Sequence, residues 1–406
     1  MRLFIFAVFL CLLIAGPWLA AAFSAGTHGN FENLIGKHDA LLVTAPNEKI
    51  IFSKNSEKML VPASTLKIFT ALVALHYLGP DYKFATEFYL DKGQNLKIKG
   101  YGDPLLISEV LQEISKKVAG KIEKVIDIVL DDSYFAQPLT IPGVSSSIQP
   151  YDAPNGALCV NFNTVNFKQS NGIYISAEPQ TPLVPFALNR IKKLGLHHGR
   201  IVFSHNNNEC TFYAGYLIKH FLNNEGLQTT GIVRTGRVHK SKDRLIFRYI
   251  SKSPVKEIIS RFLEFSNNYT TNQLLIAAGA KTHGPPGTLD KGVSAALSYA
   301  KKILDLKHTH ITEGSGISRK NKTSAKDMDK VLKAFEPYHG LMRHEGREFY
   351  KTGTLSGINT RAGYIEHPTG QLYRFVVFIN TPGKSTRRIM KKLHYQLNCG
   401  ANIQGS

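Results

Sequence analysis

The sequence has few cysteines, a single tryptophan and a shortage of acidic residues. Its 406 residues include four Cys and one Trp, and 30 Asp and Glu stand against 50 Lys and Arg. No Cys-X-X-Cys unit occurs, and the fifteen histidines form no His-Glu-X-X-His motif. Because these spacings mark common redox and zinc sites, we expect neither a metal nor an organic cofactor. Beyond the N-terminal region an odd number of cysteines remains, which leaves their pairing open: Cys159, Cys210 and Cys399.

The excess of basic residues gives a formal net charge of +20, which often indicates a nucleic-acid-binding protein. Here the basic residues are scattered among apolar periodic segments. We therefore expect no nucleic acid and favour peripheral contact with anionic membrane lipids or cell-wall polymers. An expected C-terminal helix either docks on a membrane or presents the solvated face of a packed helix, and its few apolar residues favour the second interpretation. Its basic residues are Lys384, Arg387, Arg388, Lys391 and Lys392.

The first residues have the layout of a secretory signal peptide. Met1-Arg2 supplies positive charge, residues 3–14 are apolar, and Ala20-Ala21-Ala22 offers a small-residue cleavage site. The apolar run is short for a membrane-spanning helix, although an uncleaved anchor stays an alternative, and no second run of spanning length follows. We expect cleavage after Ala22 and an exported protein, periplasmic or elsewhere in the cell envelope.

Ser64-Thr65-Leu66-Lys67 is the first of three motifs that carry the chemistry. Residues at i and i+3 share one face of a helix, so the Ser64 hydroxyl and the Lys67 amine are expected within hydrogen-bond reach. A serine needs an adjacent base to act as a nucleophile, and a lysine can be that base when burial or a second cation lowers its pKa. The preceding residues 61–63 predict a loop, which places Ser64 near a helix N-terminus, where N–H groups favour developing negative charge.

Two further motifs follow in order, Ser266-Asn267-Asn268 and Lys351-Thr352-Gly353. Residues 348–354 predict a strand, in which Lys351 would be the second cation and Gly353 would allow a close approach of the backbone to a ligand. The set S-X-X-K, S-X-N and K-T-G in this order is typical of penicillin-binding proteins and β-lactamases.

From about Leu41 to about Asn380 the chain resembles the class C penicillin-binding proteins, the D-alanyl-D-alanine carboxypeptidases and endopeptidases of peptidase family S13. Beside the three motifs, the resemblance rests on residues 102–105, 130–135 and 151–163. It rests also on residues 313–319, Glu-Gly-Ser-Gly-Ile-Ser-Arg, which are similar to the family's D-G-S-G-L-S-R. Tyr350 replaces a small residue of the family, and its ring is expected to crowd the strand or to shape the floor of the pocket.

The resemblance implies an α/β (α+β) fold of the penicillin-binding and β-lactamase type, in which an antiparallel sheet lies between helices. The pattern of elements agrees with it. A hairpin in residues 40–54 leads into the Ser64 helix, residues 86–250 are rich in strands, and helices and then strands follow Pro254. Further helices are expected over residues 106–118, 214–224, 255–265, 270–280, 293–306 and 325–335. We expect a signal peptide (1–22), a catalytic domain split into residues 23–85 and 251–406, and an inserted domain or domains over residues 86–250.

The resemblance also implies the reaction and the roles of the site residues. A serine-type D-Ala-D-Ala carboxypeptidase, possessing endopeptidase activity in some members, would cleave peptidoglycan stem peptides through an acyl-enzyme on Ser64, and β-lactams would be covalent inhibitors. Lys67 would be the base, and Ser266 with Lys351 would return a proton to the departing D-alanine. The backbone N–H groups of Ser64 and Thr354 would form the oxyanion hole. The expected catalytic residues are Ser64, Lys67, Ser266, Asn268 and Lys351, and the expected substrate-binding residues are Tyr151, Arg319, Thr352, Gly353 and Thr354.

Several alternatives stay open at this point. A β-lactamase-like hydrolase shares the motifs, but it is usually shorter, and no deacylating Glu can be located. A catalytically weak penicillin-binding envelope protein usually lacks a catalytic residue, whereas all five are present here. The sequence does not decide the balance of carboxypeptidase, endopeptidase and transpeptidase activity, the preferred stem peptide or the oligomeric state.

Overall fold

The computed structural model describes residues 31–399, with side chains up to Leu397, and a six-stranded antiparallel sheet forms its base. Asp39 pairs with Ile379, so the sheet joins the two ends of the described chain. The predicted signal peptide, residues 1–22, lies outside the described residues. In spatial order the strands are β13 (Arg343–Glu345), β14 (Glu348–Leu355), β15 (Ile358–Glu366), β16 (Leu372–Ile379), β1 (Asp39–Thr44) and β2 (Ile50–Lys54).

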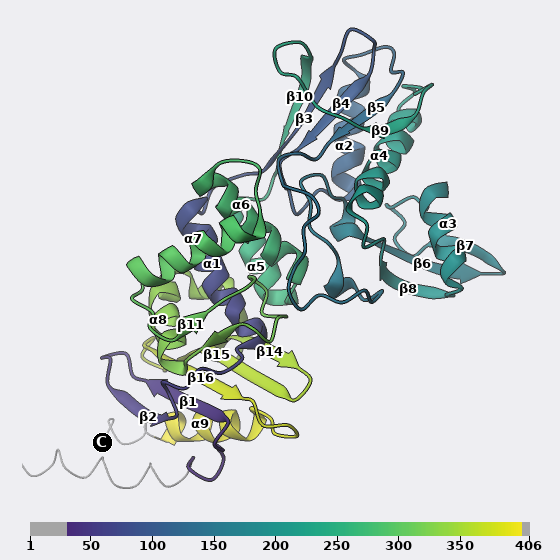
Figure 1. Cartoon of the computed structure of the whole chain (residues 1–406). Coiled ribbons are helices and arrows are strands. Elements are labelled where there is room, and N and C mark those ends of the chain that lie inside the picture. Colours follow the sequence, from purple (N-terminus) through teal and green to yellow (C-terminus); the bar gives the residue numbers. More distant parts are fainter. Residues whose placement is uncertain (1–30, 400–406) are drawn as a thin grey trace, which may run out of the picture.

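Both faces of this sheet are buried, and each strand contributes to both, because successive residues of a strand point to opposite faces. In β1, Ala40 and Leu42 belong to a core shared with the central helices. Leu41 and Val43 pack instead in a second core, which includes apolar residues of α9 (Arg387–Cys399). Figure 1 shows α9 on one side of the sheet and the other helices of this region on the opposite side. The predicted antiparallel sheet between helices is therefore confirmed.

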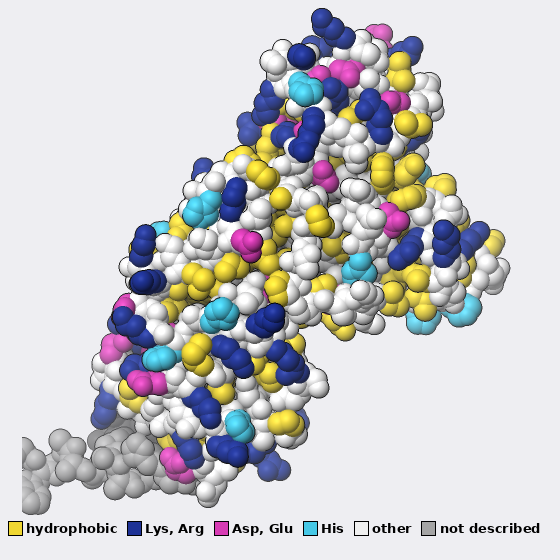
Figure 2. Space-filling model, in the orientation of Figure 1, with side chains coloured by type: hydrophobic (Ala, Val, Ile, Leu, Met, Phe, Trp, Pro, Cys, Tyr) yellow, Lys and Arg dark blue, Asp and Glu magenta, His cyan; other side chains and the backbone are white. Residues whose placement is uncertain are grey.

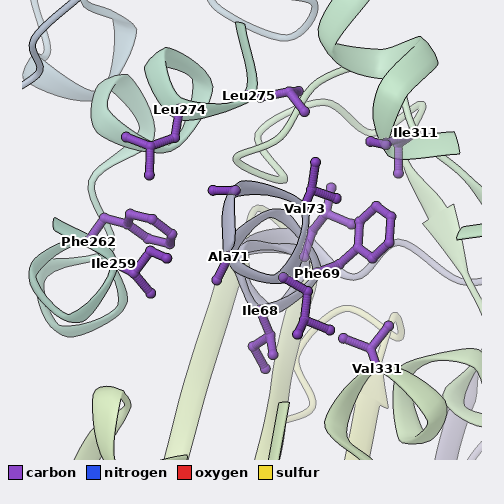
Figure 3. Packing of buried hydrophobic residues seen from close by; sticks show 14 of the residues in the cluster. Ile68, Phe69, Ala71, Val73, Ile259, Phe262, Leu274, Leu275, Ile311 and Val331 are labelled. Atoms are coloured by element: carbon purple, nitrogen blue, oxygen red, sulfur yellow. The ribbon is translucent and has the colours of Figure 1, made fainter. Parts of the chain in front are cut away.

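Helix α1 (Leu66–Tyr77) lies at the centre of the helical layer. Every residue from Leu66 to Leu75 is buried, because neighbouring helices surround α1. Figure 3 shows Ile68, Phe69, Ala71 and Val73 leaving the helix in different directions toward apolar side chains of its neighbours. A helix that is apolar on all sides is stable only inside a core, and this fixes the position of the turn before it, where Ser64 lies. The surrounding helices are α5 (Val255–Phe265), α6 (Asn268–His283), α7 (Leu289–Lys302) and α8 (Ala325–Phe335).

The residues between α1 and α5 form the second lobe in Figure 1. A five-stranded sheet of mixed direction runs in the order β10-β3-β4-β5-β9, and a three-stranded antiparallel sheet runs in the order β7-β6-β8. The strands are β3 (Ala85–Leu90), β4 (Leu96–Gly100), β5 (Ile128–Asp131), β6 (Thr164–Ser170), β7 (Ile173–Ser176), β8 (His198–Val202), β9 (Val233–Thr235) and β10 (Arg244–Ile250). The helices are α2 (Ser108–Ala119), α3 (Pro185–Leu194) and α4 (Asn207–Asn224).

Some ends of elements differ from the sequence-based expectation. The helix expected over residues 214–224 begins already at Asn207, because the Asn206 side chain caps it by accepting a hydrogen bond from the backbone N–H of Asn208 (2.9 Å). The helix expected over residues 293–306 spans Leu289–Lys302, with Thr288 as its cap. Within residues 31–399, no helix combines the length and the apolar content that crossing a bilayer requires.

Candidate active site

Ser64 lies in a short 3-10 turn, Ala63–Thr65, that leads directly into α1. Hydrogen bonds to the residue before the turn fix its position. The carbonyl oxygen of Pro62 accepts hydrogen bonds from the hydroxyl groups of Thr65 (2.7 Å) and of Thr360 on β15 (2.7 Å). Ala63 is buried and has a positive φ of 47°, which is uncommon for a residue with a side chain. The half-buried Ser64 thus stands at the N-terminal end of α1, as the sequence predicts.

Lys67 is completely buried one turn later and has three hydrogen-bond partners. Its Nζ lies 3.0 Å from Ser64 Oγ, 2.8 Å from Asn268 Oδ1 and 2.6 Å from the carbonyl oxygen of Ser315. Burial lowers the pKa of Lys67 far below its usual value, the charge of Lys351 lowers this pKa further, and the charge of Glu313 opposes them. The arrangement places an amine of strongly lowered pKa in contact with the Ser64 hydroxyl, which favours the neutral, basic form of the amine.

The second motif forms the junction between α5 and α6. Ser266 ends α5 in the left-handed conformation, with φ of 56°. The Asn267 side chain caps α6 by accepting a hydrogen bond from Thr270 N (2.8 Å), a role that Asp would fill equally well. Asn268 then begins α6, bonds to Lys67 and donates from Nδ2 to the carbonyl oxygen of Tyr151 (3.3 Å). The half-buried Ser266 hydroxyl makes no hydrogen bond within the described part of the chain.

The third motif brings β14 against the nucleophile turn. An ideal Cβ built on Gly353 would lie 2.7 Å from Ser64 N and 2.3 Å from Thr360 Oγ1, so any side chain at this position would push the strand away. Lys351 is buried beside it, and its Nζ donates to the carbonyl oxygen of Thr352 (2.9 Å). Burial, together with the charge of Arg343, lowers the pKa of Lys351 to about 8.

The expected substrate-binding side chains lie on exposed surface. Thr352 and Thr354 are exposed on β14, and the guanidinium of the exposed Arg319 donates to the carbonyl oxygen of Ser356. The Tyr151 side chain is 55% exposed, while its backbone carbonyl contacts Asn268.

The expectation for Tyr350 at the pocket is wrong. This ring is buried in the α9 core, stacked under the Arg361 guanidinium at 3.7 Å, because β14 directs Tyr350 and Lys351 to opposite faces of the sheet.

Sequence reasoning overlooked Glu313 and the carbonyl group of Ser315. Both belong to residues 313–319, which carry part of the family resemblance. In the structure the carbonyl contacts Lys67, and Glu313 is a fully buried carboxylate. Gly316 has a φ of +82°, and an ideal Cβ on it would lie 1.9 Å from the carbonyl oxygen of Ala63. An acidic residue followed by Gly-Ser-Gly is a signal for a loop whose backbone N–H groups turn toward a carboxylate.

A sheet between helices, with a Ser–Lys pair at the start of the central helix and a K-T-G strand beside it, defines a serine acyl-transfer enzyme of the penicillin-binding class. The model of the D-Ala-D-Ala carboxypeptidase 3 (S13) family matches residues 27–194 and 175–344. The chain therefore belongs to this family, whose members are serine-type D-Ala-D-Ala carboxypeptidases and endopeptidases that bind penicillin.

Individual relatives agree with the family match. The chain is 27% identical to a D-alanyl-D-alanine carboxypeptidase of Actinomadura sp. over 81% of this chain and 75% of the relative. It is 24% identical to D-alanyl-D-alanine carboxypeptidase DacB of Haemophilus influenzae, over 85% of each chain.

Among solved structures, penicillin binding protein 4 (dacB) of H. influenzae superposes with a TM-score of 0.71, at 20% identity, over 87% of this chain and 93% of that one. A predatory endopeptidase of Bdellovibrio bacteriovorus superposes with a TM-score of 0.54, at 18% identity, over 88% and 92% of the two chains. These superpositions confirm the predicted fold class.

Proposed function

We propose that the protein hydrolyses the terminal D-Ala-D-Ala bond of peptidoglycan stem peptides through an acyl-enzyme on Ser64, and that β-lactams acylate the same oxygen. The observation that carries this proposal is the contact of 3.0 Å between the Ser64 hydroxyl and the buried amine of Lys67. Its support is that a lysine in this environment can be neutral, and hence a base, at a pH where an ordinary lysine is charged.

In the first step, Ser64 Oγ attacks the carbonyl carbon of the penultimate D-alanine and its proton passes to Lys67 Nζ. The backbone N–H groups of Ser64 and Thr354 are the proposed oxyanion donors, and the absence of a side chain at Gly353 lets β14 approach the turn that carries Ser64. The C–N bond then breaks, and the departing amine takes up a proton through Ser266 with the help of Lys351. Water hydrolyses the ester and regenerates Ser64.

The remaining predicted residues are assigned to substrate binding. Lys351 and the exposed Thr352 and Thr354 hydroxyl groups are proposed to bind the terminal carboxylate, in keeping with the family resemblance of the K-T-G strand. Asn268 is proposed to hold the peptide backbone as well as Lys67. Arg319 and Tyr151 are proposed to line the outer cleft, where an acidic part of the stem peptide would meet the guanidinium.

Mass spectrometry of the intact protein tests the proposal. After exposure to benzylpenicillin, the mass should rise by one penicilloyl group, and peptide mapping should locate it on Ser64; Ser64→Ala should stay unmodified. The wild type should also release D-alanine from pentapeptide muropeptides. Cleavage of cross-linked muropeptide dimers would add the endopeptidase activity. A folded wild-type protein without label would overturn the proposal, and fast β-lactam turnover without peptide cleavage would favour the β-lactamase alternative.

We further propose that the protein is exported, loses its signal peptide after Ala22 and contacts anionic envelope material through its basic surface, the Lys and Arg side chains that Figure 2 shows spread over both lobes. Ile389, Met390 and Leu393 of α9 are buried against the sheet, so these three apolar side chains are not available to insert into a membrane. Arg387 and Arg388 are exposed on the same helix. Any docking by α9 would therefore be electrostatic and peripheral.

Residues 86–250 are proposed to be a domain inserted into the catalytic domain. The proposal is supported by a core of its own, made mainly from α2, α4 and the strands of the five-stranded sheet. One part of the segment packs instead in the core around α1, which includes Phe135, Leu139, Ile141 and Ala157. The stretch around these residues would join the insertion to the catalytic domain.

A further inference from the structure

The loop that follows β11 (Thr309–His310) is folded around the carboxylate of Glu313, which has no exposed surface. This carboxylate accepts six hydrogen bonds. Oε2 accepts from Ser315 N (2.6 Å), Ser315 Oγ (2.7 Å) and Asn272 Nδ2 (3.1 Å). The partners of Oε1 are Gly316 N (2.8 Å), Ser318 N (3.3 Å) and Asn321 Nδ2 (2.6 Å). Every one of these groups can donate a hydrogen atom, which matches the needs of an ionised carboxylate.

The loop held in this way lies directly on the first turns of α1. The carbonyl oxygen of Gly314 accepts a hydrogen bond from Thr70 Oγ1 (2.7 Å), and that of Ser315 accepts from Lys67 Nζ (2.6 Å). The next residue, Gly316, packs on the backbone of Ala63 so closely that no side chain would fit. Three consecutive loop residues therefore contact the helix turn that carries the nucleophile and its base.

The three partners of Lys67 determine where the lone pair of its neutral amine points. A neutral amine has two N–H donors and one lone pair. The Asn268 Oδ1 and Ser315 carbonyl oxygens can only accept hydrogen bonds, so they take the two N–H groups. Ser64 Oγ, 3.0 Å away, is the remaining partner, so its hydroxyl group donates a hydrogen bond to the lone pair. A general base needs this orientation to remove the hydroxyl proton.

We propose that Glu313 is a positioning residue for acylation, which holds the Ser315 carbonyl on Lys67 and thereby directs the lone pair of the amine at the Ser64 hydroxyl. This inference rests on the proposed function. When Ser64 Oγ bonds to the substrate carbonyl carbon, its O–H bond breaks and the proton forms a new N–H bond on Lys67. The ammonium that results still has three acceptors, and the buried negative charge of Glu313 favours it.

The charges around Lys67 decide how the pH dependence of acylation should change when Glu313 is replaced. Lys351 of β14 and Glu313 of the loop act on Lys67 with opposite signs. Lys351 is itself influenced by Arg343 of β13 and by Glu264 at the end of α5. Two titratable side chains on other helices packed against α1 contact residues other than Lys67. Tyr299 of α7 packs on His76 and Tyr77, and Asp327 of α8 accepts hydrogen bonds from His308 N and Thr309 Oγ1.

The test is the rate constant of benzylpenicillin acylation as a function of pH, measured together with thermal unfolding. Glu313→Gln removes the charge that raises the pKa of Lys67, so the acid limb should move to lower pH. Its plateau should fall by roughly 10- to 100-fold, the effect of a displaced catalytic group. Glu313→Asp keeps the charge on a shorter side chain, so its plateau should fall while the acid limb stays. Asp327→Asn, a change at another buried carboxylate, should lower the unfolding temperature and leave both features of the profile unchanged.

Wild-type acid limb and plateau in folded Glu313→Gln would overturn the inference, as would a loss of thermal stability alone. If Glu313→Gln does not fold, Glu313→Asp decides: a lower plateau with an unchanged acid limb supports the inference, and a wild-type plateau overturns it. Failure of the wild-type protein to acylate at all is a different result, because it would overturn the proposed function.

Discussion

At the scale of single residues, the proposed chemistry depends on the protonation of two buried lysines. Lys67 must be neutral to accept a proton, and Lys351 must be charged to bind a carboxylate. Both lysines are buried, and each lies close enough to another cation for its pKa to be lowered further. The enzyme should therefore work in a pH window that is limited by Lys67 on the acid side and by Lys351 on the alkaline side.

Lys67→Arg tests the proposed base while keeping a long cationic side chain. A guanidinium stays protonated at any accessible pH, so the rate of penicillin acylation should fall by roughly 10²–10⁴-fold, the usual contribution of a general base. Lys67→Met, which is uncharged, should be equally slow, and this excludes an effect of charge alone. Lys301→Arg on the exposed end of α7 is the matched control. Near-wild-type acylation by folded Lys67→Arg would assign the base to another group.

The alkaline limb of kcat/KM for a peptide with a free terminal carboxylate should lie near pH 8. The pKa of Lys351 is lowered to about 8, so its positive charge is present below this pH and is lost as the pH rises through it. Steady-state kinetics from pH 6 to pH 10 would measure the limb. Lys351→Arg should reduce kcat/KM overall but move the limb to higher pH, because arginine keeps its charge. An unchanged limb in that variant would show that another group titrates there.

At the scale of elements, the nucleophile turn is held between β14 and the loop of residues 313–321. Gly353 of β14 and Gly316 of the loop both contact the backbone of residues 63–64 at distances that leave no space for a Cβ. The turn is therefore located by tertiary packing on both sides, in addition to its place at the start of α1.

Gly353→Ala should separate β14 from this turn. Its Cβ would lie 2.7 Å from Ser64 N and 2.9 Å from Ala63 Cβ, so the strand must shift away from one of the proposed oxyanion donors. We expect acylation to slow by roughly 10²–10³-fold, the cost of losing one such donor. Gly340→Ala is the matched control, because a Cβ there has no atom within 4 Å. The prediction is wrong if Gly353→Ala acylates like Gly340→Ala.

Sequence patterns located those parts of the site that depend on neighbouring residues. The i to i+3 spacing of Ser64 and Lys67 is a property of one helical turn, and residues 348–355 follow a strand pattern. Glu313 was missed because its donors come from α6 and from its own loop as far as Asn321, and no local periodicity connects them. The direction of the Tyr350 ring was missed because an alternating pattern does not say which face of a doubly covered sheet is the cleft.

At the scale of the whole molecule, the positive charge should govern binding to envelope material. If the basic surface docks on anionic sacculi or vesicles, sedimentation with them should decrease steeply between about 0.05 and 0.5 M salt, as the Debye length shortens. Changing Arg387, Arg388 and Lys391 to Gln should weaken this binding and leave hydrolysis of a soluble peptide intact. The exposed lysines of the other lobe provide a control with the same loss of charge, by changing Lys116, Lys117 and Lys121 to Gln.

Equal losses in the two triple variants would assign the binding to net charge in place of α9. Binding that does not respond to salt would contradict the electrostatic proposal. Absence of binding at every salt concentration would make the charge a determinant of solubility only.

The pairing of β1 with β16 has a consequence for how this enzyme is made. A ribosome completes Ser64 and Lys67 early, but β1 cannot pair with β16 until residues 372–379 have emerged, and Lys351 is also synthesised late. Joining segments so distant in the sequence closes a very long loop, which is typical of slow, late folding steps. During most of its synthesis the nascent chain would contain Ser64 without the neighbours that activate it. The enzyme would therefore be inactive until its C-terminal strands have been made and have folded onto β1.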